Sequence, residues 1–301
     1  MPSKQKQSKK ETEKPITLTE KTIAFFREIG IVLVAVLILN SFVLASFEVP
    51  TGSMEDTVMT GDFLFVNKFI FGGSTPYAIP LTSIRIPHFR IPGFRSIQHG
   101  DVIVFDWPGE RDLKGKPPQT WYLKRCVGLP GDTIVIVNRV VYVNGQVFPN
   151  PPDLKFQRMT TLPADLPRGV LFPRGSNFNE DNYGPVIVPK KGMKIQLNAE
   201  NFSSWDVFIF REGHQAELNG ERVLIDGKET TEYVVERDYA FGMGDNRDDS
   251  LDSRFWGFIP MEDIIGTPMI VYWSWDPNLP IYQLVDKIKS INFGRIGKII
   301  R

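Results

Sequence analysis

Thr120 to Asn138 reads TWYLKRCVGLPGDTIVIVN, two short apolar runs separated by a Gly-x-Pro-Gly-Asp turn. Each run is rich in β-branched and aromatic residues and is bounded by glycine, proline or aspartate, which is typical of short β-strands. Similar runs precede it, DFLFVNKFIF from Asp62 and DVIVFDW from Asp101. Asn144-Gly145 and Asp226-Gly227 lie between further apolar alternations and predict tight hairpins. The sequence therefore predicts a mainly β protein built on an antiparallel β-sheet.

Changes in composition divide the chain into four parts. Residues 1–22 are polar and lysine-rich and predict a disordered basic tail, whereas residues 23–47 predict a transmembrane anchor. Residues 48–137 and 240–301 together carry the strands of the main β domain. Between them, a proline-rich stretch followed by renewed β patterning predicts an inserted β-rich subdomain over residues 138–239.

The apolar run from Ile29 to Phe47 contains nineteen residues without a charge. At about 1.5 Å per residue, this is close to the length that crosses a hydrocarbon core of about 30 Å. The alternative is a cleaved signal peptide, but its apolar core covers only about 7–15 residues, so a permanent anchor is preferred. Six lysines against three glutamates occur between Met1 and Lys21. The positive-inside rule then predicts a cytoplasmic N-terminus, with everything after Phe47 outside.

The residue inventory excludes several classes of protein. The formal net charge is zero, so no basic field indicates a nucleic-acid partner. The single cysteine, Cys126, excludes an intrachain disulfide and a cysteine-based zinc site. His88, His99 and His214 show no HExxH spacing, and no G-x-S-x-G elbow accompanies them. No phosphate-binding glycine motif is present, and neither a metal nor another cofactor is expected.

The candidate chemistry lies in a serine just after the apolar run and a lysine in a predicted strand. Ser53 lies in FEVPTGSMEDTV, Phe47 to Val58, with no histidine nearby in the sequence to act as its base. A lysine base must be neutral, and at the reference pKa of about 10.4 roughly one lysine in 2,500 is neutral at pH 7. Desolvation lowers that pKa by up to about 3–5 units. Lys124 is therefore the candidate base, because apolar and aromatic residues surround it, namely Trp121, Tyr122, Leu123 and Val127.

A third stretch, GMGDNRDDSLDSRFWG from Gly242 to Gly257, is too polar for a core strand and too specific for a linker. A plain interpretation is a surface loop whose ion pairs are worth about a few tenths of a kcal/mol each. In combination with the serine and lysine stretches, however, it resembles the bacterial type I signal peptidases, membrane-anchored Ser/Lys proteases that remove signal peptides. The matching blocks are PTGSMEDTV from Pro50, GDFLFVNKFIFG from Gly61, YLKRCVGLPGD from Tyr122 and GDNRDDSLDSRFWG from Gly244.

The resemblance implies a role for each matching position. Ser53 would be the nucleophile and Lys124 the general base, and Ser250 would hydrogen-bond the lysine amine. The Ser53 amide and the Thr51 hydroxyl would form the oxyanion hole. Supporting roles would fall to Met54, Arg125, Asp245, Asp252 and Arg254. Shallow pockets for small substrate residues would be walled by Phe47, Val49 and Leu123.

One position departs from the family pattern, because Asp56 stands where the family usually has proline. The aspartate is expected to point to solvent, because the other catalytic positions match the family; close to the site, its carboxylate would stabilise protonated Lys124. It keeps open the alternative of a catalytically silent, membrane-anchored module that binds preproteins. A self-cleaving Ser/Lys regulator would need a DNA-binding segment where this chain has its apolar run. A generic anchored scaffold leaves the joint presence of the three blocks unexplained.

The resemblance also implies a substrate and a setting. The substrate would be a membrane-inserted preprotein whose cleavage segment adds as a β-strand between FEVPTGS and WYLK. The protein would lie in the cytoplasmic membrane with its catalytic domain on the outer, periplasmic face, in contact with the lipid bilayer and near the secretion machinery. The basic C-terminal stretch from Leu279 fits a membrane-surface segment and a solvated helix or strand equally well. Trp273 and Trp275 are candidates for residues that lie at the membrane–water interface.

Overall fold

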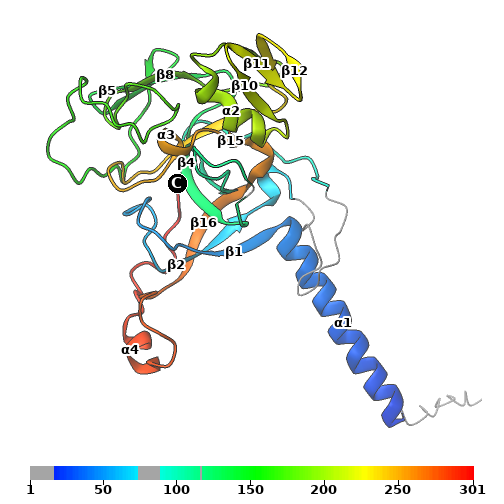
Figure 1. Ribbon diagram of the computed structural model, residues 1–301. Helices are drawn as coiled ribbons and strands as arrows, with labels where there is room; N and C mark the ends of the chain where they lie inside the picture. The colour runs from blue at the N-terminus through cyan, green and yellow to red at the C-terminus, as the bar shows by residue number, and fades with distance from the viewer. Residues whose placement is uncertain (1–16, 74–88, 116) are drawn as a thin grey trace, which may run out of the picture. The chain divides into compact units, whose positions relative to one another are not determined.

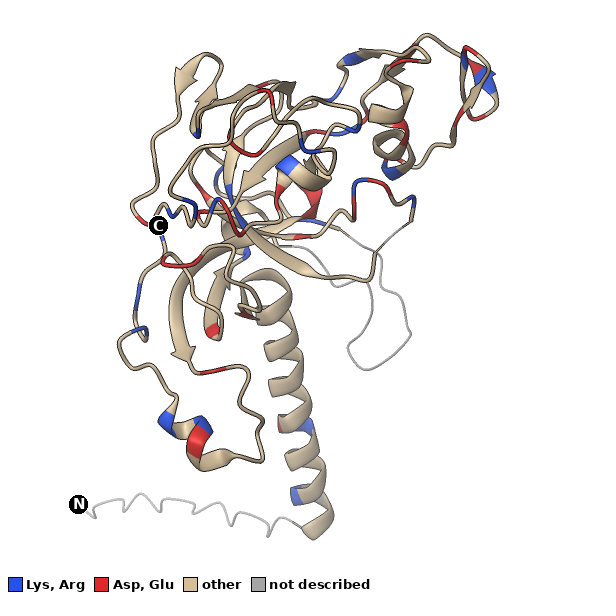
Figure 2. Cartoon of the chain, turned by 60° about the vertical axis from the view of Figure 1, so that its left-hand side comes forward, with Lys and Arg blue, Asp and Glu red and all other residues tan. Residues whose placement is uncertain are grey.

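A computed structural model describes residues 17–73, 89–115 and 117–301. The contacts divide the chain into two units, which end and begin at Asn40 and Ser41. The first contains all but the last two residues of helix α1 (Leu18–Phe42), shown in Figure 1. Among the described residues, it is the one helix long and apolar enough to cross a membrane by length and composition. Its C-terminal part carries no charged side chain, as Figure 2 shows.

The predicted anchor extends too far at its C-terminal end. Helix α1 ends at Phe42, and Leu44–Glu48, most of which was assigned to the anchor, is strand β1. Side chains alternate along this strand, so that Ala45 and Phe47 are buried. Its backbone pairs with strand β2 (Asp62–Asn67) over the whole of its length. Sheet pairing and burial therefore end the helix, although the sequence stays apolar.

An antiparallel sheet of seven strands lies at the centre of the second unit (Figure 1), in the order β1-β2-β16-β3-β4-β14-β15. Strand β16 lies between β2 and β3 and pairs with both, so a strand late in the sequence joins strands that come early in it. The mainly β, antiparallel fold is thus confirmed. The strands not yet located are β3 (Val102–Asp106), β4 (Trp121–Gly128), β14 (Tyr239–Met243), β15 (Ile259–Pro260) and β16 (Ile264–Ser274).

The residues between β4 and β14 form smaller sheets and one helix, α2 (Phe202–Arg211). Both predicted hairpins are present, because Asn144-Gly145 and Asp226-Gly227 have positive φ at both turn positions. The sheets have the orders β7-β6-β5-β8, β13-β9 and β10-β11-β12. Their strands are β5 (Thr133–Val137), β6 (Val140–Val143), β7 (Gln146–Val147), β8 (Tyr183–Ile187), β9 (Lys194–Gln196), β10 (Ala216–Asn219), β11 (Arg222–Ile225), β12 (Lys228–Glu229) and β13 (Glu232–Val234).

Short helices complete the fold. The run predicted as one strand from Asp62 to Phe71 divides into β2 and the 3₁₀ helix η1 (Phe69–Phe71). The Asn67 side chain accepts a hydrogen bond from the Ile70 amide at 3.2 Å, which turns the chain out of the sheet. The others are α3 (Ser253–Trp256), η2 (Met261–Asp263) and α4 (Leu284–Lys289).

The largest hydrophobic cluster joins the inserted segment to the central sheet. Val141 and Tyr233 of the inserted segment pack in the same cluster as Val127 of β4 and Phe241 of β14. A second cluster lies beneath the turn that carries Ser53 and includes residues of β1 and β4. The proposed division into a main domain and a subdomain at residues 138 and 239 stays a prediction.

Candidate active site

The side chains of Ser53 and Lys124 meet although they lie far apart in the sequence. Ser53 lies in the connection between β1 and β2. Two hydrogen bonds of 2.9 Å join the ends of this connection: the Gly61 amide donates to the Val49 carbonyl, and the Val49 amide donates to the Asp62 carbonyl. Lys124 lies in the middle of β4. Its Nζ donates to Ser53 Oγ at 2.6 Å. The two side chains are nearly covered, with 2% of Lys124 and 8% of Ser53 exposed.

The surroundings of Lys124 favour its neutral form. Burial lowers the pKa of its amine to about 8, although the nearby carboxylates of Asp252 and Asp245 act against this and Arg254 adds to it. The amine also donates to the Leu123 carbonyl at 2.9 Å, an acceptor without charge. With a pKa of about 8, a substantial minority of the amine is neutral near neutral pH, and it lies within hydrogen-bonding distance of a serine hydroxyl. The arrangement can therefore activate Ser53 as a nucleophile.

Two glycines of the third stretch allow β14 to approach this pair. A Cβ on Gly242 would lie 3.1 Å from Lys124 Cβ. A Cβ on Gly244 would lie 2.2 Å from Ser250 Oγ and 2.5 Å from the Ser53 carbonyl oxygen. Glycine is needed at position 244, because no larger residue fits between the serine turn and Ser250.

Ser250 is brought to the site but does not make the expected contact. Its hydroxyl is buried and has no hydrogen-bond partner among the residues that the structure describes. The Lys124 amine instead donates to Ser53 and to the Leu123 carbonyl. The Ser250 hydroxyl is therefore a buried polar group next to the pair with its hydrogen-bonding capacity unused.

The predicted supporting residues form two buried ion pairs. Arg125 binds Asp245 through two contacts of 2.8 and 2.7 Å. Asp245 also accepts from the Thr57 hydroxyl at 2.7 Å, and its amide donates to the Met54 sulfur at 3.3 Å. These contacts fix the serine turn to the Gly242–Gly257 stretch.

The second ion pair joins Asp252 to Arg254 at 2.9 and 2.8 Å. Burial alone would raise the pKa of the Asp252 carboxyl, but the Arg254 guanidinium outweighs this effect and lowers the pKa. Asp252 also accepts from the Gly244 amide at 3.1 Å and caps helix α3. Because the positive charge of Arg254 offsets the negative charge of Asp252, this carboxylate raises the pKa of Lys124 less than an isolated carboxylate would.

A cavity of about 310 Å³ opens over the pair. Ser53 and Lys124 lie in its lining together with Thr51. The three predicted pocket residues, Phe47, Val49 and Leu123, also line it. The structure therefore gathers all candidate catalytic residues except Ser250 around one cavity, with Ser250 against the glycine behind it.

Asp56 lies away from the lysine amine. Its side chain is half exposed, and the Lys155 ammonium lies 3.7 Å from its carboxylate. Lys298 donates a hydrogen bond to its carbonyl oxygen. Its φ is 74°, whereas a proline ring holds φ near about −65°, so the proline typical of the family does not fit this turn. The charges that act on Lys124 are those of Asp252, Arg254 and Asp245.

The inserted segment contributes contacts that the sequence analysis missed. The Lys155 amide donates to the Asp245 carbonyl, and the Arg247 amide donates to the Lys155 carbonyl, both at 2.9 Å. The Lys155 side chain binds Glu55, two residues after Ser53, at 2.9 Å. No periodicity or motif in the sequence indicated this pairing.

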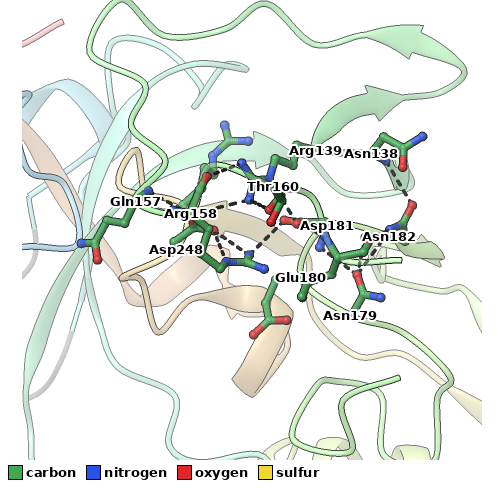
Figure 3. Close-up of polar contacts among 12 residues, drawn as sticks. Asn138, Arg139, Gln157, Arg158, Thr160, Asn179, Glu180, Asp181, Asn182 and Asp248 are labelled. Atoms are coloured by element: carbon green, nitrogen blue, oxygen red, sulfur yellow. Dashed lines mark hydrogen bonds and ion pairs between the residues drawn. The ribbon is translucent and has the colours of Figure 1, made fainter. Parts of the chain in front are cut away.

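A polar network behind the site continues this connection (Figure 3). Arg158 binds Asp248 at 2.6 and 3.1 Å and Asp181 at 3.1 Å. Arg139 binds Asp181 at 3.1 Å. Asp248 lies two residues before Ser250, so the network ties the inserted segment to the loop that carries this serine.

Comparison with known proteins gives one consistent result. The sequence model of the family described as "Signal peptidase, peptidase S26" matches residues 22–273, which include β1, β4 and the Gly242–Gly257 stretch. Signal peptidase I of Buchnera aphidicola subsp. Schizaphis graminum is 30% identical over 85% of this chain and 76% of its own. Signal peptidase I of Rickettsia typhi is 29% identical over 94% of this chain and 96% of its own.

Two further similarities complete the comparison. Signal peptidase I of Pseudomonas aeruginosa is 30% identical over 89% of this chain and 76% of its own. A solved structure of a signal peptidase I from Enterococcus faecalis aligns with 57% of this chain and 97% of its own at 19% identity. Its TM-score of 0.27 is too low to support a conclusion about the fold.

Proposed function

The chain belongs to the signal peptidase family, peptidase S26, and from this membership we propose that Ser53 and Lys124 are its catalytic pair. Membership makes the protein a serine endopeptidase that removes signal peptides from preproteins. The observation that carries the proposal is the 2.6 Å contact between Lys124 Nζ and Ser53 Oγ. The silent binding module is not favoured, since the family match covers both catalytic stretches.

The geometry supports a two-step acyl transfer. Neutral Lys124 takes the Ser53 hydroxyl proton as Ser53 Oγ attacks the scissile carbonyl carbon. The Ser53 amide and the Thr51 hydroxyl stabilise the oxyanion. Lys124 then returns the proton to the leaving amine, and the acyl-enzyme ester remains on Ser53. A water molecule, deprotonated by Lys124, attacks the ester carbonyl carbon, and Lys124 returns that proton to Ser53 Oγ as the acyl group leaves.

Substrate binding is proposed to use the edge of the central sheet. Strand β1 is the first strand in the order of that sheet, so its outer edge can pair with an extended segment. Phe47 and Val49 of this region and Leu123 of β4 would then receive the small side chains before the cut. Replacing Val49 with Phe would shift the preference to smaller side chains, and an unchanged preference in a peptide series would remove Val49 from the pocket.

The anchor is proposed to place the N-terminus in the cytoplasm and the catalytic unit on the outer face, near the secretion machinery. The excess of lysine before α1 supports this orientation. A membrane-impermeant thiol reagent should fail to label a cysteine placed at Ser3 in intact cells. Labelling at that position would contradict the orientation.

The rate of cleavage is expected to increase with pH as Lys124 loses its proton. The pKa of Lys124 is lowered to about 8 and the neutral amine is the active form, so kcat/KM rises through that region and levels off above it. The measurement is kcat/KM for a signal-peptide substrate across pH, with protein folding monitored at each value. A profile that is flat from about pH 6 to about pH 10 would remove Lys124 as the base.

Ser250→Ala is expected to lower kcat by about ten-fold or more, because the hydroxyl is proposed to orient the lysine amine once Ser53 turns to the substrate. Stability should not fall, since the hydroxyl has no hydrogen-bond partner among the described residues. The thermal midpoint and kcat of the purified variant test both statements. An unchanged kcat would show that Ser250 does not orient Lys124.

A further inference from the structure

A second cavity, of about 330 Å³, takes no part in the reaction described above. None of its lining residues lines the cavity over Ser53. Helix α2, strands β14 and β15 and the chain after β3 contribute to its walls. Seven aromatic side chains line the cavity together with seven charged ones, and the aromatic ones are Trp107, Phe172, Phe208, Phe210, Tyr239, Trp256 and Phe258. A cavity of this size, in which aromatic rings and charged groups meet, can hold a small molecule.

Three of the four arginines in the cavity lining have carboxylate partners. Arg111 binds Asp112 at 2.6 Å, and Arg237 binds Glu262 at 2.7 Å. Arg174 lies 3.1 Å from Asp112 and 3.2 Å from Asp206. These three guanidinium groups are therefore neutralised within the protein.

Arg211, the last residue of α2, is the exception. It donates to the carbonyls of Trp256 at 3.0 Å and Glu110 at 2.6 Å, and its Nε has no partner in the described part of the chain. No ion pair of Arg211 occurs among the described residues. Burial lowers the pKa of Arg211 to about 10, so it remains protonated at neutral pH. Carbonyl dipoles and the C-terminal end of α2 stabilise this cation, but neither provides a full negative charge.

Carboxylates in the same lining restrict the charge of a ligand. Glu262 is held by Arg237, and Asp106 accepts from the Thr120 amide at 3.1 Å. Asp263 also lines the cavity. With Glu262 offset by Arg237, the charges of Asp106 and Asp263 disfavour a multiply charged anion such as a phosphate ester, whereas one carboxylate placed at Arg211 meets a single opposite charge.

We infer that this cavity binds a small organic acid with one carboxylate and a flat apolar body. The carboxylate pairs with the Arg211 guanidinium, and the apolar body lies between the aromatic walls. Trp107, one of these walls, stacks on Tyr122, whose ring lies 5.5 Å from the Lys124 amine. Binding does not require catalysis, so the inference does not depend on the catalytic roles proposed for Ser53 and Lys124.

The test compares three carboxylates with their neutral carboxamides. The probes are 2-naphthoate, indole-3-acetate and phenylacetate, and the full chain is titrated in detergent by calorimetry. At least one carboxylate should bind saturably and about ten-fold or more tightly than its amide, as expected for a charge-assisted hydrogen bond. Arg211→Gln should reduce the affinity of the carboxylate to that of the amide. Ser53→Ala should bind like the unmodified chain.

Arg174→Gln is the matched control, because Arg174 lines the same cavity while Asp112 and Asp206 keep Arg111 and Lys114 as partners. This variant should keep the preference for the carboxylate. If Arg211→Gln does not fold, Ser203→Phe serves instead, because it adds a ring to the lining. It should lose binding of the carboxylates and of their carboxamides. Equal affinity for acid and amide, a preference that survives Arg211→Gln, or no saturable binding of any probe would overturn the inference.

Discussion

Lys124→Arg is expected to abolish cleavage of preproteins. Arginine keeps the positive charge and approximate length of lysine, but its guanidinium does not lose a proton near neutral pH. The lowered pKa of Lys124, which would let its amine act as a base, therefore has no counterpart in the variant. Loss of general base catalysis alone costs about 10²–10⁴ in rate, and kcat/KM of the purified variant measures it.

Two further variants make this result interpretable. Lys155→Arg is the control, because Lys155 binds Glu55 at the edge of the same turn and keeps its ion pair as arginine. It should retain activity. A charged guanidinium in the Lys124 position also costs stability, so Lys124→Met, a neutral residue of similar length, tests the loss in a folded protein. Measurable turnover by either Lys124 variant would remove Lys124 as the base.

Gly244→Ala is expected to disable the enzyme without changing any candidate catalytic side chain. The added Cβ would lie 2.2 Å from Ser250 Oγ and 2.5 Å from the Ser53 carbonyl oxygen, so one of these groups must move. Overpacking of this kind costs about 1–3 kcal/mol of stability, and a displacement of about 1 Å at a nucleophile can cost about 10²-fold in rate. The unfolding free energy and kcat should both fall.

Gly169→Ala is the matched control for this substitution. A Cβ on Gly169 meets no atom within 4 Å, and the residue is exposed. Its stability and activity should match those of the unmodified chain. Full activity in Gly244→Ala would mean that the segment after β14 does not pack against the serine turn as described.

The strands were predictable because their signals are local. Short runs bounded by turn residues located β3, β4 and β5, and two pairs of turn residues located both hairpins. The end of α1 was not predictable, because the sequence of Leu44–Glu48 is compatible with both a strand and a helix. Only its pairing with β2, a contact with a distant segment, decides between the two.

The site was predictable in part. Apolar neighbours in the sequence indicated that Lys124 would be buried, but only the family resemblance paired it with Ser53, which lies 71 residues away. The contacts of Lys155 and Arg158 left no signal, since each joins the inserted segment to a loop about 90 to 100 residues distant. The unused hydroxyl of Ser250 likewise depends on three-dimensional packing, which no spacing reveals.

The most direct test of the account is cleavage of a precursor with an Ala-x-Ala site by the full chain in detergent, run beside Ser53→Ala. Sequencing of the new N-terminus identifies the cleaved bond. The account predicts one cut directly after the second alanine and no cut by the folded Ser53→Ala variant. The same cut by Ser53→Ala, or no cut by the folded unmodified chain with several precursors, would contradict Ser53 as the nucleophile of an active signal peptidase.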